Sequence, residues 1–326
     1  MTTPTRGMTT LEAVVNISEG RDPRVLHLLK QSAGTALLDT HVDPDHNRSV
    51  FTMAGSVADL DGSSDLEDAV KQLASVAVEH LDVRTHAGVH PRLGVVDVVP
   101  FVPLAFRHRR ERVSGAHLPG GAHRRLSEAR LVAAPTLDPA AQARDRFSKW
   151  AGSVLGVPCF SYGPIDRNEH RSLPDIRRSA FSTLQPESGP SQPHPSAGAC
   201  AVGARPLLIA YNVWIRGVDP TKARSVAAAV RGPGVRALAL PMHREPGAVQ
   251  VSCNLVDPFT TGPAHVHDRI ARLVENHGGS VLRCELVGLL PAGVLDAIPP
   301  SRWSELDLRP ESTIEARLED RGFPVG

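Results

Sequence analysis

The chain has few aromatic residues and few cysteines, and its positive and negative charges nearly cancel. Phenylalanine, tyrosine and tryptophan together make up 4% of its 326 residues, and no apolar segment approaches the roughly 20 residues of a membrane-spanning helix. A formal net charge of +1 gives no general electrostatic attraction to nucleic acid. We therefore expect neither a membrane nor a nucleic acid as a partner.

The cysteines also argue against a secreted protein held together by disulfides. There are four of them, and they lie far apart without a CxxC pair: Cys159, Cys200, Cys253 and Cys284. At least three lie in apolar, strand-like segments, which is typical of reduced thiols in a core. The first residues lack the apolar segment of a secretory signal. We therefore expect a cytoplasmic protein.

Hydrophobic periodicity predicts the same order of elements in both halves of the chain. Strands are expected at residues 12–16, 36–40, 48–54 and 95–101, with helices beginning near residue 22 and spanning 65–80. The second half repeats this order, with strands at 207–215, 235–240, 249–255 and 281–287 and helices near 220–231 and 264–276. The pattern predicts an α+β fold of two similar βαββαβ (ferredoxin-like) subdomains, with the sheets facing a common cleft and the helices outside.

Composition suggests where these units begin and end. We expect a disordered N-terminus at 1–11, a first subdomain at 12–186, a Pro-, Ser- and Gly-rich linker at 187–198, a second subdomain at 199–300 and a peripheral tail at 301–326. A helix near 138–155 and a strand at 157–162 are expected to extend the first sheet.

Residues 84–100, RTHAGVHPRLGVVDVVP, are the most informative segment. Gly88 and Pro91 disfavour a helix, and the apolar run that follows predicts a buried strand, so His90 is expected on a rigid turn at the end of a sheet. An imidazole titrates near neutrality and can both accept and donate a proton, which suits a general acid/base. The alternative is a loop histidine that only stabilises the turn.

A second polar segment, residues 41–48, places imidazoles and carboxylates close together. With the neighbouring loop it offers candidate metal ligands for a hydrolase, namely His41, Asp43, His46, His86 and His90. The alternative is that Asp43 and Asp45 flank Pro44 in an ordinary turn.

The loop motif resembles the HxGEHPRxGxxDVxPFxP signature of the glutamate formiminotransferase family. It matches at His86, Gly88, His90, Pro91, Arg92, Gly94, Asp97, Pro100, Phe101 and Pro103. Further similarity lies in VVNISEG (14–20), LLDTHVDPDHNRSVFT (37–52), LPDIR (173–177), GPSQPHPSAGACAVGAR (189–205), LIAYNV (208–213), QVSCNLVD (250–257) and ELVGLLP (285–291).

The resemblance implies an enzyme that moves a formimino group from N-formimino-L-glutamate to tetrahydrofolate, without a metal and as a homodimer. It places His90 at the catalytic histidine. It implies substrate-binding roles for Asp39, His41, Arg48, His86 and Arg92. It also implies a folate-binding segment made of Gly189, Pro190, Ser191, Gln192, Pro193, His194, Pro195, Ser196, Ala197 and Gly198. Alternatives are a folate-binding protein without transferase activity and the metal-dependent hydrolase.

Two positions depart from the family pattern. The family has a glutamate where this chain has Val89, and an aspartate where it has His41. Both replacements remove a carboxylate close to the expected chemistry, so the preferred formimino or formyl donor stays open.

Overall fold

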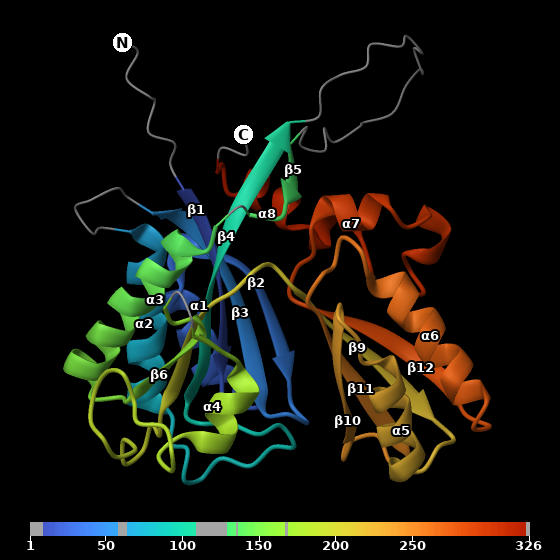
Figure 1. Cartoon of the computed structure of the whole chain (residues 1–326), viewed down its shortest axis with the longest axis horizontal. Helices are drawn as coiled ribbons and strands as arrows, with labels where there is room; N and C mark the ends of the chain where they lie inside the picture. The colour runs from blue at the N-terminus through green and yellow to red at the C-terminus, as the bar shows by residue number, and fades with distance from the viewer. Residues whose placement is uncertain (1–8, 58–63, 109–128, 135, 167–168, 324–326) are drawn as a thin grey trace.

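The computed structural model describes residues 9–57, 64–108, 129–134, 136–166 and 169–323, and its strands form two sheets. In Figure 1 the sheets lie side by side, with the helices of the first half on one outer side and α5 and α6 on the other. Of the N-terminus expected to be disordered, residues 1–11, residues 1–8 lie outside the described part of the chain. The next residues do not fit the expectation, because a strand begins at Thr9.

The first half folds as the periodicity predicts. Its elements are β1 (Thr9–Ile17), α1 (Pro23–Ser32), β2 (Leu37–Asp43), β3 (Arg48–Val57), α2 (Asp65–His80) and β4 (Val96–His108). The strands pair antiparallel in the order β2-β3-β1-β4. Both helices begin at side-chain caps, Asp22 for α1 and Ser64 for α2, which satisfy backbone N–H groups that have no partner within the helix.

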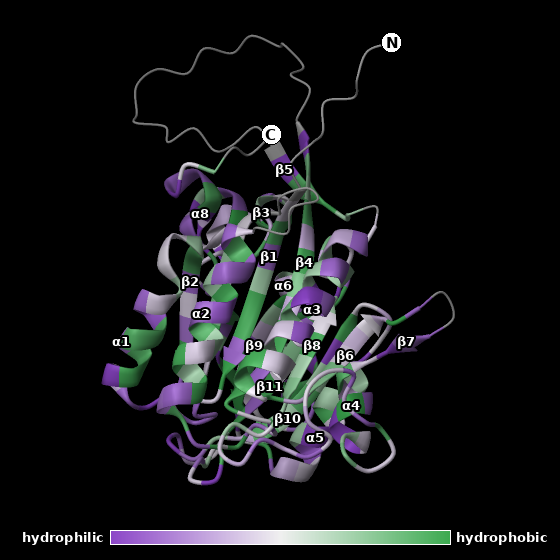
Figure 2. Cartoon of the chain, turned by 90° about the vertical axis from the view of Figure 1, so that its left-hand side faces the viewer, coloured by the Kyte–Doolittle hydropathy of each residue, from purple (hydrophilic) through white to green (hydrophobic). Residues whose placement is uncertain are grey.

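The helices cover one face of this sheet. Alternate residues of β3, such as Phe51 and Met53, pack in a core with Leu66, Val70 and other apolar residues of α2. Because successive side chains of a strand point to opposite faces, Arg48 and Thr52 lie on the other face, toward the second sheet. Figure 2 shows the polar residues of α2 and α3 on their outer sides and apolar residues on the strands behind them.

The first sheet has more strands than predicted, and it contains parallel as well as antiparallel pairs. It also contains β5 (Ala129–Val132), β6 (Cys159–Pro164), β7 (His170–Arg171) and β8 (Cys200–Ala204), and β8 pairs parallel with both β4 and β6. Residues 200–204 were expected in the second subdomain. All five are buried, as is typical of a strand inside a parallel arrangement.

The connections of this region also differ in detail from the predictions. The helix expected at 138–155 is α3 (Asp138–Trp150) followed by a π-helical turn, Ala151–Leu155, and α4 (Leu173–Ser179) was not predicted. All four cysteines are free and buried.

The second half repeats the strand order of the first. Its elements are β9 (Ile209–Arg216), α5 (Pro220–Val230), β10 (Val235–Pro241), β11 (Ala248–Leu255), α6 (Pro263–Glu275) and β12 (Ser280–Val287). The four strands pair antiparallel in the order β10-β11-β9-β12. Apolar residues of α5 and α6, among them Val226 and Ile270, share a core with this sheet.

The C-terminal residues are not peripheral as expected. They form α7 (Ala292–Asp296), short 3-10 turns at Pro300–Arg302 and Pro310–Ser312, and α8 (Ile314–Asp320). Leu306, Ile314 and Leu318 are almost fully buried, and the Tyr211 hydroxyl donates to the Leu306 carbonyl at 2.8 Å. The sequence did not predict this packing, because the few apolar residues of the segment are surrounded by many charged ones.

The sheets contact each other along β2 and β12. His41 Nε2 lies 3.4 Å from Glu285 Oε1, and the backbone N–H of Arg244 donates to Asp45 Oδ1 at 3.0 Å. Within the described part of the chain, no helix is both long and apolar enough to cross a membrane.

Candidate active site

The loop that carries His90 is organised by Arg92. Its Nη2 donates to the carbonyls of Gly88 at 2.8 Å and His90 at 2.6 Å, and its Nη1 donates to His86 Nδ1. His86 Nε2 in turn donates to the Asn47 carbonyl at 2.8 Å. Both residues are therefore engaged inside the loop, which fixes its shape and the tautomer of His86.

His90 lies half-buried on this loop with one ring nitrogen free. Its Nδ1 donates to the Pro91 carbonyl at 2.7 Å, which leaves Nε2 as the nitrogen with a lone pair. Desolvation, and then the positive charge of Arg48, lower the pKa of His90 to about 3. The imidazole is thus neutral at physiological pH and able to accept a proton.

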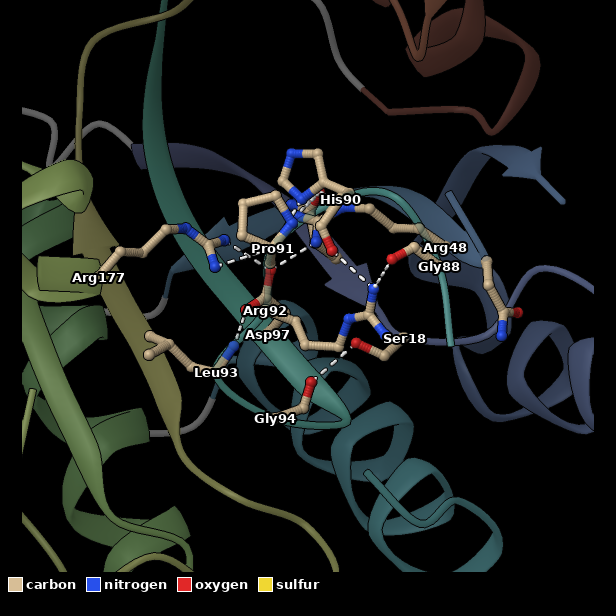
Figure 3. A network of polar contacts seen from close by, with 12 residues as sticks. Ser18, Arg48, Gly88, His90, Pro91, Arg92, Leu93, Gly94, Asp97 and Arg177 are labelled. Carbon is tan, nitrogen blue, oxygen red and sulfur yellow. Dashed lines mark hydrogen bonds and ion pairs between the residues drawn. The ribbon is translucent and has the colours of Figure 1, made fainter. Parts of the chain in front are cut away.

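A buried ion network lies under the loop (Figure 3). Asp97, which is fully buried, accepts hydrogen bonds from Arg48 on β3, from Arg177 on α4 at 2.7 Å and from the Leu93 backbone N–H at 2.7 Å. Burial alone would raise the pKa of the Asp97 carboxyl, but the two guanidinium groups outweigh it and hold this pKa at about 2. The carboxylate stays ionised and anchors both arginines.

The same arginines hold the loop in place. Arg177 Nη1 donates to the Pro91 carbonyl at 2.9 Å, and Arg48 donates to Asn16 Oδ1 at 2.8 and 3.1 Å. Ser18 Oγ donates to the Gly94 carbonyl at 2.8 Å, which joins the end of the loop to β1. Three separate elements therefore fix the position of His90.

The turn between β2 and β3 brings a second histidine close to His90. The ring centroids of His46 and His90 are 5.7 Å apart, and His46 Nδ1 lies 3.4 Å from Asp43 Oδ2. Asp43 Oδ1 also accepts the backbone N–H groups of Asp45 and His46, each at 2.8 Å. This is the turn arrangement that the Asp-Pro-Asp sequence predicted as the alternative to metal ligands.

Asp39 and His41 lie on a neighbouring cavity of about 610 Å³ between β2, β12 and the C-terminal residues. Asp39 Oδ1 is 3.6 Å from Arg317 on α8, and His41 faces Glu285. The Glu285 carboxylate accepts side-chain hydrogen bonds from Asn212, Trp214 and Gln250. The cavity is therefore lined mainly by charged and polar groups.

Residues 189–198 pack against the His90 loop and do not simply link the two sheets. The backbone N–H of Val83 donates to the Ser196 carbonyl at 2.8 Å, and that of Val95 to the Ala197 carbonyl at 2.9 Å. Gly198 has φ of +73°, and a Cβ there would lie 2.4 Å from the Leu93 carbonyl oxygen, so glycine is required. Gly189 to Pro193 are exposed on the same segment.

The predicted site residues thus fall into three neighbouring groups. Arg48, His86, His90 and Arg92 form one cluster, Asp39 and His41 line the cavity, and residues 189–198 pack against the ends of the loop. Sequence reasoning missed Arg177 and Glu285, although both lie in segments that resemble the family, LPDIR and ELVGLLP. Within the described ranges, no three His, Cys, Asp or Glu residues are grouped so that they could hold a metal ion.

A loop histidine above a buried Arg–Asp–Arg network, beside a polar cavity between two sheets, defines a small-molecule site in a two-sheet α+β protein. The chain belongs to the formiminotransferase family: residues 10–205 match the model described as "Formiminotransferase domain, N-terminal subdomain". That match ends just after β8, in agreement with the place of this strand in the first sheet.

Several characterised relatives carry names from this family. The glutamate formimidoyltransferase of Streptococcus pyogenes serotype M1 is 30% identical over 87% of this chain and 90% of its own length, and that of Thermoplasma acidophilum is 30% identical over 88% and 90%. The formimidoyltransferase-cyclodeaminase of Sus scrofa is 29% identical, and the chain spans 51% of it. A crystal structure of an unknown protein from Galdieria sulphuraria has a TM-score of 0.27 and 8% identity, too little to support any argument.

Proposed function

We propose that this protein transfers the formimino group of N-formimino-L-glutamate to tetrahydrofolate. In this proposal His90 is the general acid/base that exchanges protons with the nitrogens bonded to the formimino carbon. One observation carries the proposal. His90 is held rigidly with a neutral ring and a free Nε2, on the motif that the chain shares with its family. A general base must be unprotonated before it acts, and this imidazole is.

The chemistry needs proton transfer at two nitrogens. The attacking amine loses a proton as it bonds to the formimino carbon, and the glutamate nitrogen gains one as its bond to that carbon breaks. His90 Nε2 takes the proton of the amine. Arg48 and Arg177 keep His90 in place, because both are fixed by Asp97.

The arrangement of the loop refines the roles expected for its other residues. Arg92 and His86 already use their polar atoms within the loop, so we assign them to positioning His90 and not to the substrate. Asp39 and His41 line the cavity, and we keep a substrate-binding role for these two residues and for Arg48.

Residues 189–198 are the proposed contact for tetrahydrofolate, the co-substrate. Their exposed part, Gly189 to Pro193, suits a flat ligand because its backbone can be approached closely. Hydrogen bonds from Val83 and Val95 tie Ser196 and Ala197 of this segment to the two ends of the His90 loop. Tetrahydrofolate supplies the amine that receives the formimino group.

The finer features of the fold belong to the same proposal. The strand order of the two antiparallel sets, second-third-first-fourth in each half, supports two ferredoxin-like units that face a common cleft. We also propose a cytoplasmic homodimer. Light scattering of the purified protein tests the dimer.

An assay of the purified protein with N-formiminoglutamate and tetrahydrofolate tests the proposed function. We expect transfer that survives dialysis against a chelator. Tetrahydrofolate binding without transfer would instead indicate a binding protein of this fold. Loss of activity on chelation, restored by zinc, would favour the metal-dependent hydrolase, which hydrolysis of the donor without folate would identify.

A further inference from the structure

Arg177 reaches the His90 loop from α4, outside both repeated units. Its Nη1 donates to the Pro91 carbonyl at 2.9 Å, and His90 Nδ1 donates to the same oxygen at 2.7 Å. The two nitrogens therefore lie within about 6 Å of each other, because they share one acceptor. Figure 3 shows the guanidinium pointing toward Pro91 and Asp97. Arg177 is thus within reach of a small molecule on which His90 acts.

Arg177 also keeps N–H groups that are free for another acceptor. A guanidinium has five N–H donors. Among the residues that the structure describes, Arg177 donates one hydrogen bond from each Nη nitrogen and none from Nε. All three nitrogens of Arg48 donate, to Asn16 and Asp97. Arg92 uses both of its Nη nitrogens inside the loop. The side chain of Arg177 is 18% exposed, so it can take a further acceptor.

The network beneath the loop carries more positive than negative charge. Asp97 is one carboxylate between two guanidinium groups, those of Arg48 and Arg177. The neighbouring Arg92 responds to this excess. Burial lowers the pKa of its guanidinium, with Asp97 opposing the shift, and the charges of Arg48 and Arg177 lower it further. A partly buried positive charge is costly without a counter-charge, so the network favours the binding of an anion.

We propose that Arg177 binds the α-carboxylate of the formimino donor, the carboxylate on the carbon that bears the reacting nitrogen. This inference rests on the proposed function and names the class of donor, which is an amidine of an α-amino acid. Guanidinium and carboxylate groups are both planar and can form two parallel hydrogen bonds. Because an α-carboxylate is only one carbon away from the reacting nitrogen, it stays close to the atoms on which His90 acts. The short distance between Arg177 and His90 fits that arrangement.

The binding of a carboxylate at Arg177 has two consequences for the transfer. Arg177 is held by two hydrogen bonds to the protein before a donor arrives, so it loses little conformational freedom on binding. The positive charge of Arg177 also contributes, after burial and the charge of Arg48, to the low pKa of His90. A bound carboxylate offsets that charge, so His90 becomes a stronger base once the donor is in place.

The kinetic test compares Arg177→Met with Arg178→Met. Arg177→Met removes the guanidinium and keeps a long side chain. Arg178 is the matched control, because it is the next residue of α4, is exposed and pairs with Asp175. Each protein is assayed with three donors: N-formimino-L-glutamate, N-formimino-L-2-aminobutyrate, which keeps only the α-carboxylate, and 4-formimidamidobutanoate, which keeps only the side-chain carboxylate. Arg178→Met should match wild type with all three.

The quantity that decides is the factor by which Arg177→Met lowers kcat/KM with each donor. Arg177 also holds the loop, so the variant can lower the rate with every donor. The factor should be about ten- to a hundredfold larger for the two donors with an α-carboxylate than for 4-formimidamidobutanoate, the scale of a lost charge-assisted hydrogen bond. Equal factors for all three donors would reduce Arg177 to a structural role. A factor that is largest for 4-formimidamidobutanoate would assign it to the side-chain carboxylate. Either result would overturn the inference.

A binding measurement without turnover separates this inference from the proposed function. In calorimetric titrations Arg177→Met should weaken the binding of N-acetyl-L-glutamate about tenfold or more and leave that of 4-acetamidobutanoate within about threefold of wild type. Arg177→Lys, which keeps the charge, should recover part of the loss. If wild type does not transfer but binds in this way, the proposed function fails and the carboxylate site stands. If wild type transfers and Arg177→Met binds N-acetyl-L-glutamate as tightly as wild type, the inference fails and the transferase stands.

Discussion

The second sheet and the antiparallel part of the first have the same strand order, but the two sheets hold their buried acids in different ways. In the first sheet Asp97 is bound by two guanidinium groups that offset its charge, and the histidine above it stays neutral because burial, and then the charge of Arg48, lower its pKa. In the second sheet Glu285 is held by uncharged amide and indole donors, so its charge remains available to His41. One arrangement of strands thus provides two opposite electrostatic environments on either side of a cavity.

The largest expected difference between the sheets is in stability. Asp97→Asn leaves two partly buried arginines without their counter-charge and should lower the free energy of unfolding by about 3–5 kcal/mol. Glu285→Gln keeps the size of the side chain and an oxygen that can still accept from the neutral donors, and it removes only the charge, so the loss should be smaller, about 1–2 kcal/mol. Urea denaturation at pH 7 measures both. Equal losses would show that the two acids are held alike.

The next largest effect is expected in the His90 loop, where a substitution should lower activity without lowering folate affinity or stability. His90→Ala should lose transfer by about a hundredfold or more, a barrier increase of about 2.7 kcal/mol, while folate affinity and the unfolding midpoint stay near wild type. Steady-state kinetics and tetrahydrofolate titration measure these quantities. Turnover within about threefold of wild type would remove His90 from the mechanism.

Two buried glutamates, one on each sheet, should contribute to the stability of the fold in ways that depend oppositely on pH. Desolvation, opposed by Arg205, raises the pKa of Glu12 on β1 to about 7, whereas the pKa of Glu285 is lowered to about 2, because His41 and the amide donors outweigh desolvation. Glu12 lies between Ala54 and Val102, two residues of an apolar cluster. Within the part of the chain that the structure describes, Arg205 is what offsets the desolvation of Glu12.

The sign of each effect follows from proton linkage. Below about pH 4.5 Glu12 is protonated in both folded and unfolded states, and stability falls as pH rises through 7, where ionisation costs about 2–3 kcal/mol. Glu12→Gln should therefore stabilise the protein at pH 8 and not at pH 4. The contribution of Glu285 is present above about pH 4.5 and is lost as pH falls toward 2. Thermal unfolding at pH 4 and pH 8 checks Glu12, and a stabilisation independent of pH would contradict it.

The smallest expected effect concerns a carboxylate that this chain lacks. Val89→Glu would place an acid beside His90, where it can bind the cationic formimino group with a charge-assisted hydrogen bond. If wild type is slow with N-formiminoglutamate, we expect kcat/KM to rise about tenfold, and Val89→Gln serves as the uncharged control. A lower rate in Val89→Glu from an already efficient wild type would show that the acid is dispensable here.

Periodicity predicted the repeated part of the fold because amphipathic helices and half-buried strands leave a clear signal. It placed β8 in the wrong half, since Cys200–Ala204 follows a Pro- and Gly-rich segment that has the composition of a linker. Its parallel pairing with β4 depends on residues about 100 positions apart in the chain. The burial of apolar residues in the C-terminal segment, such as Leu306, was not predicted either. Their neighbours in sequence are mostly charged, and the residues they pack against are distant in the chain.

The site was predictable only as far as local motifs reach. His90 and Arg48 were singled out from their motifs, and the structure places Arg48 on Asp97 and His90 on the loop above it. The substrate-binding role expected for Arg92 could not be tested from sequence, because its bonds to Gly88 and His90 depend on the loop conformation. Arg177 and Glu285 reach the site from other elements and have no neighbours in sequence that mark them.

The hydrogen bonds from Val83 and Val95 to residues 196 and 197 have a mechanical consequence. They make the His90 loop and the 189–198 segment a single piece attached to the first sheet. A hinge motion that separated the sheets would therefore carry both together and keep their relative geometry. Only the distance to Glu285 and the second sheet would change, so a small molecule could enter or leave between the sheets without disturbing the arrangement of the His90 loop and residues 189–198.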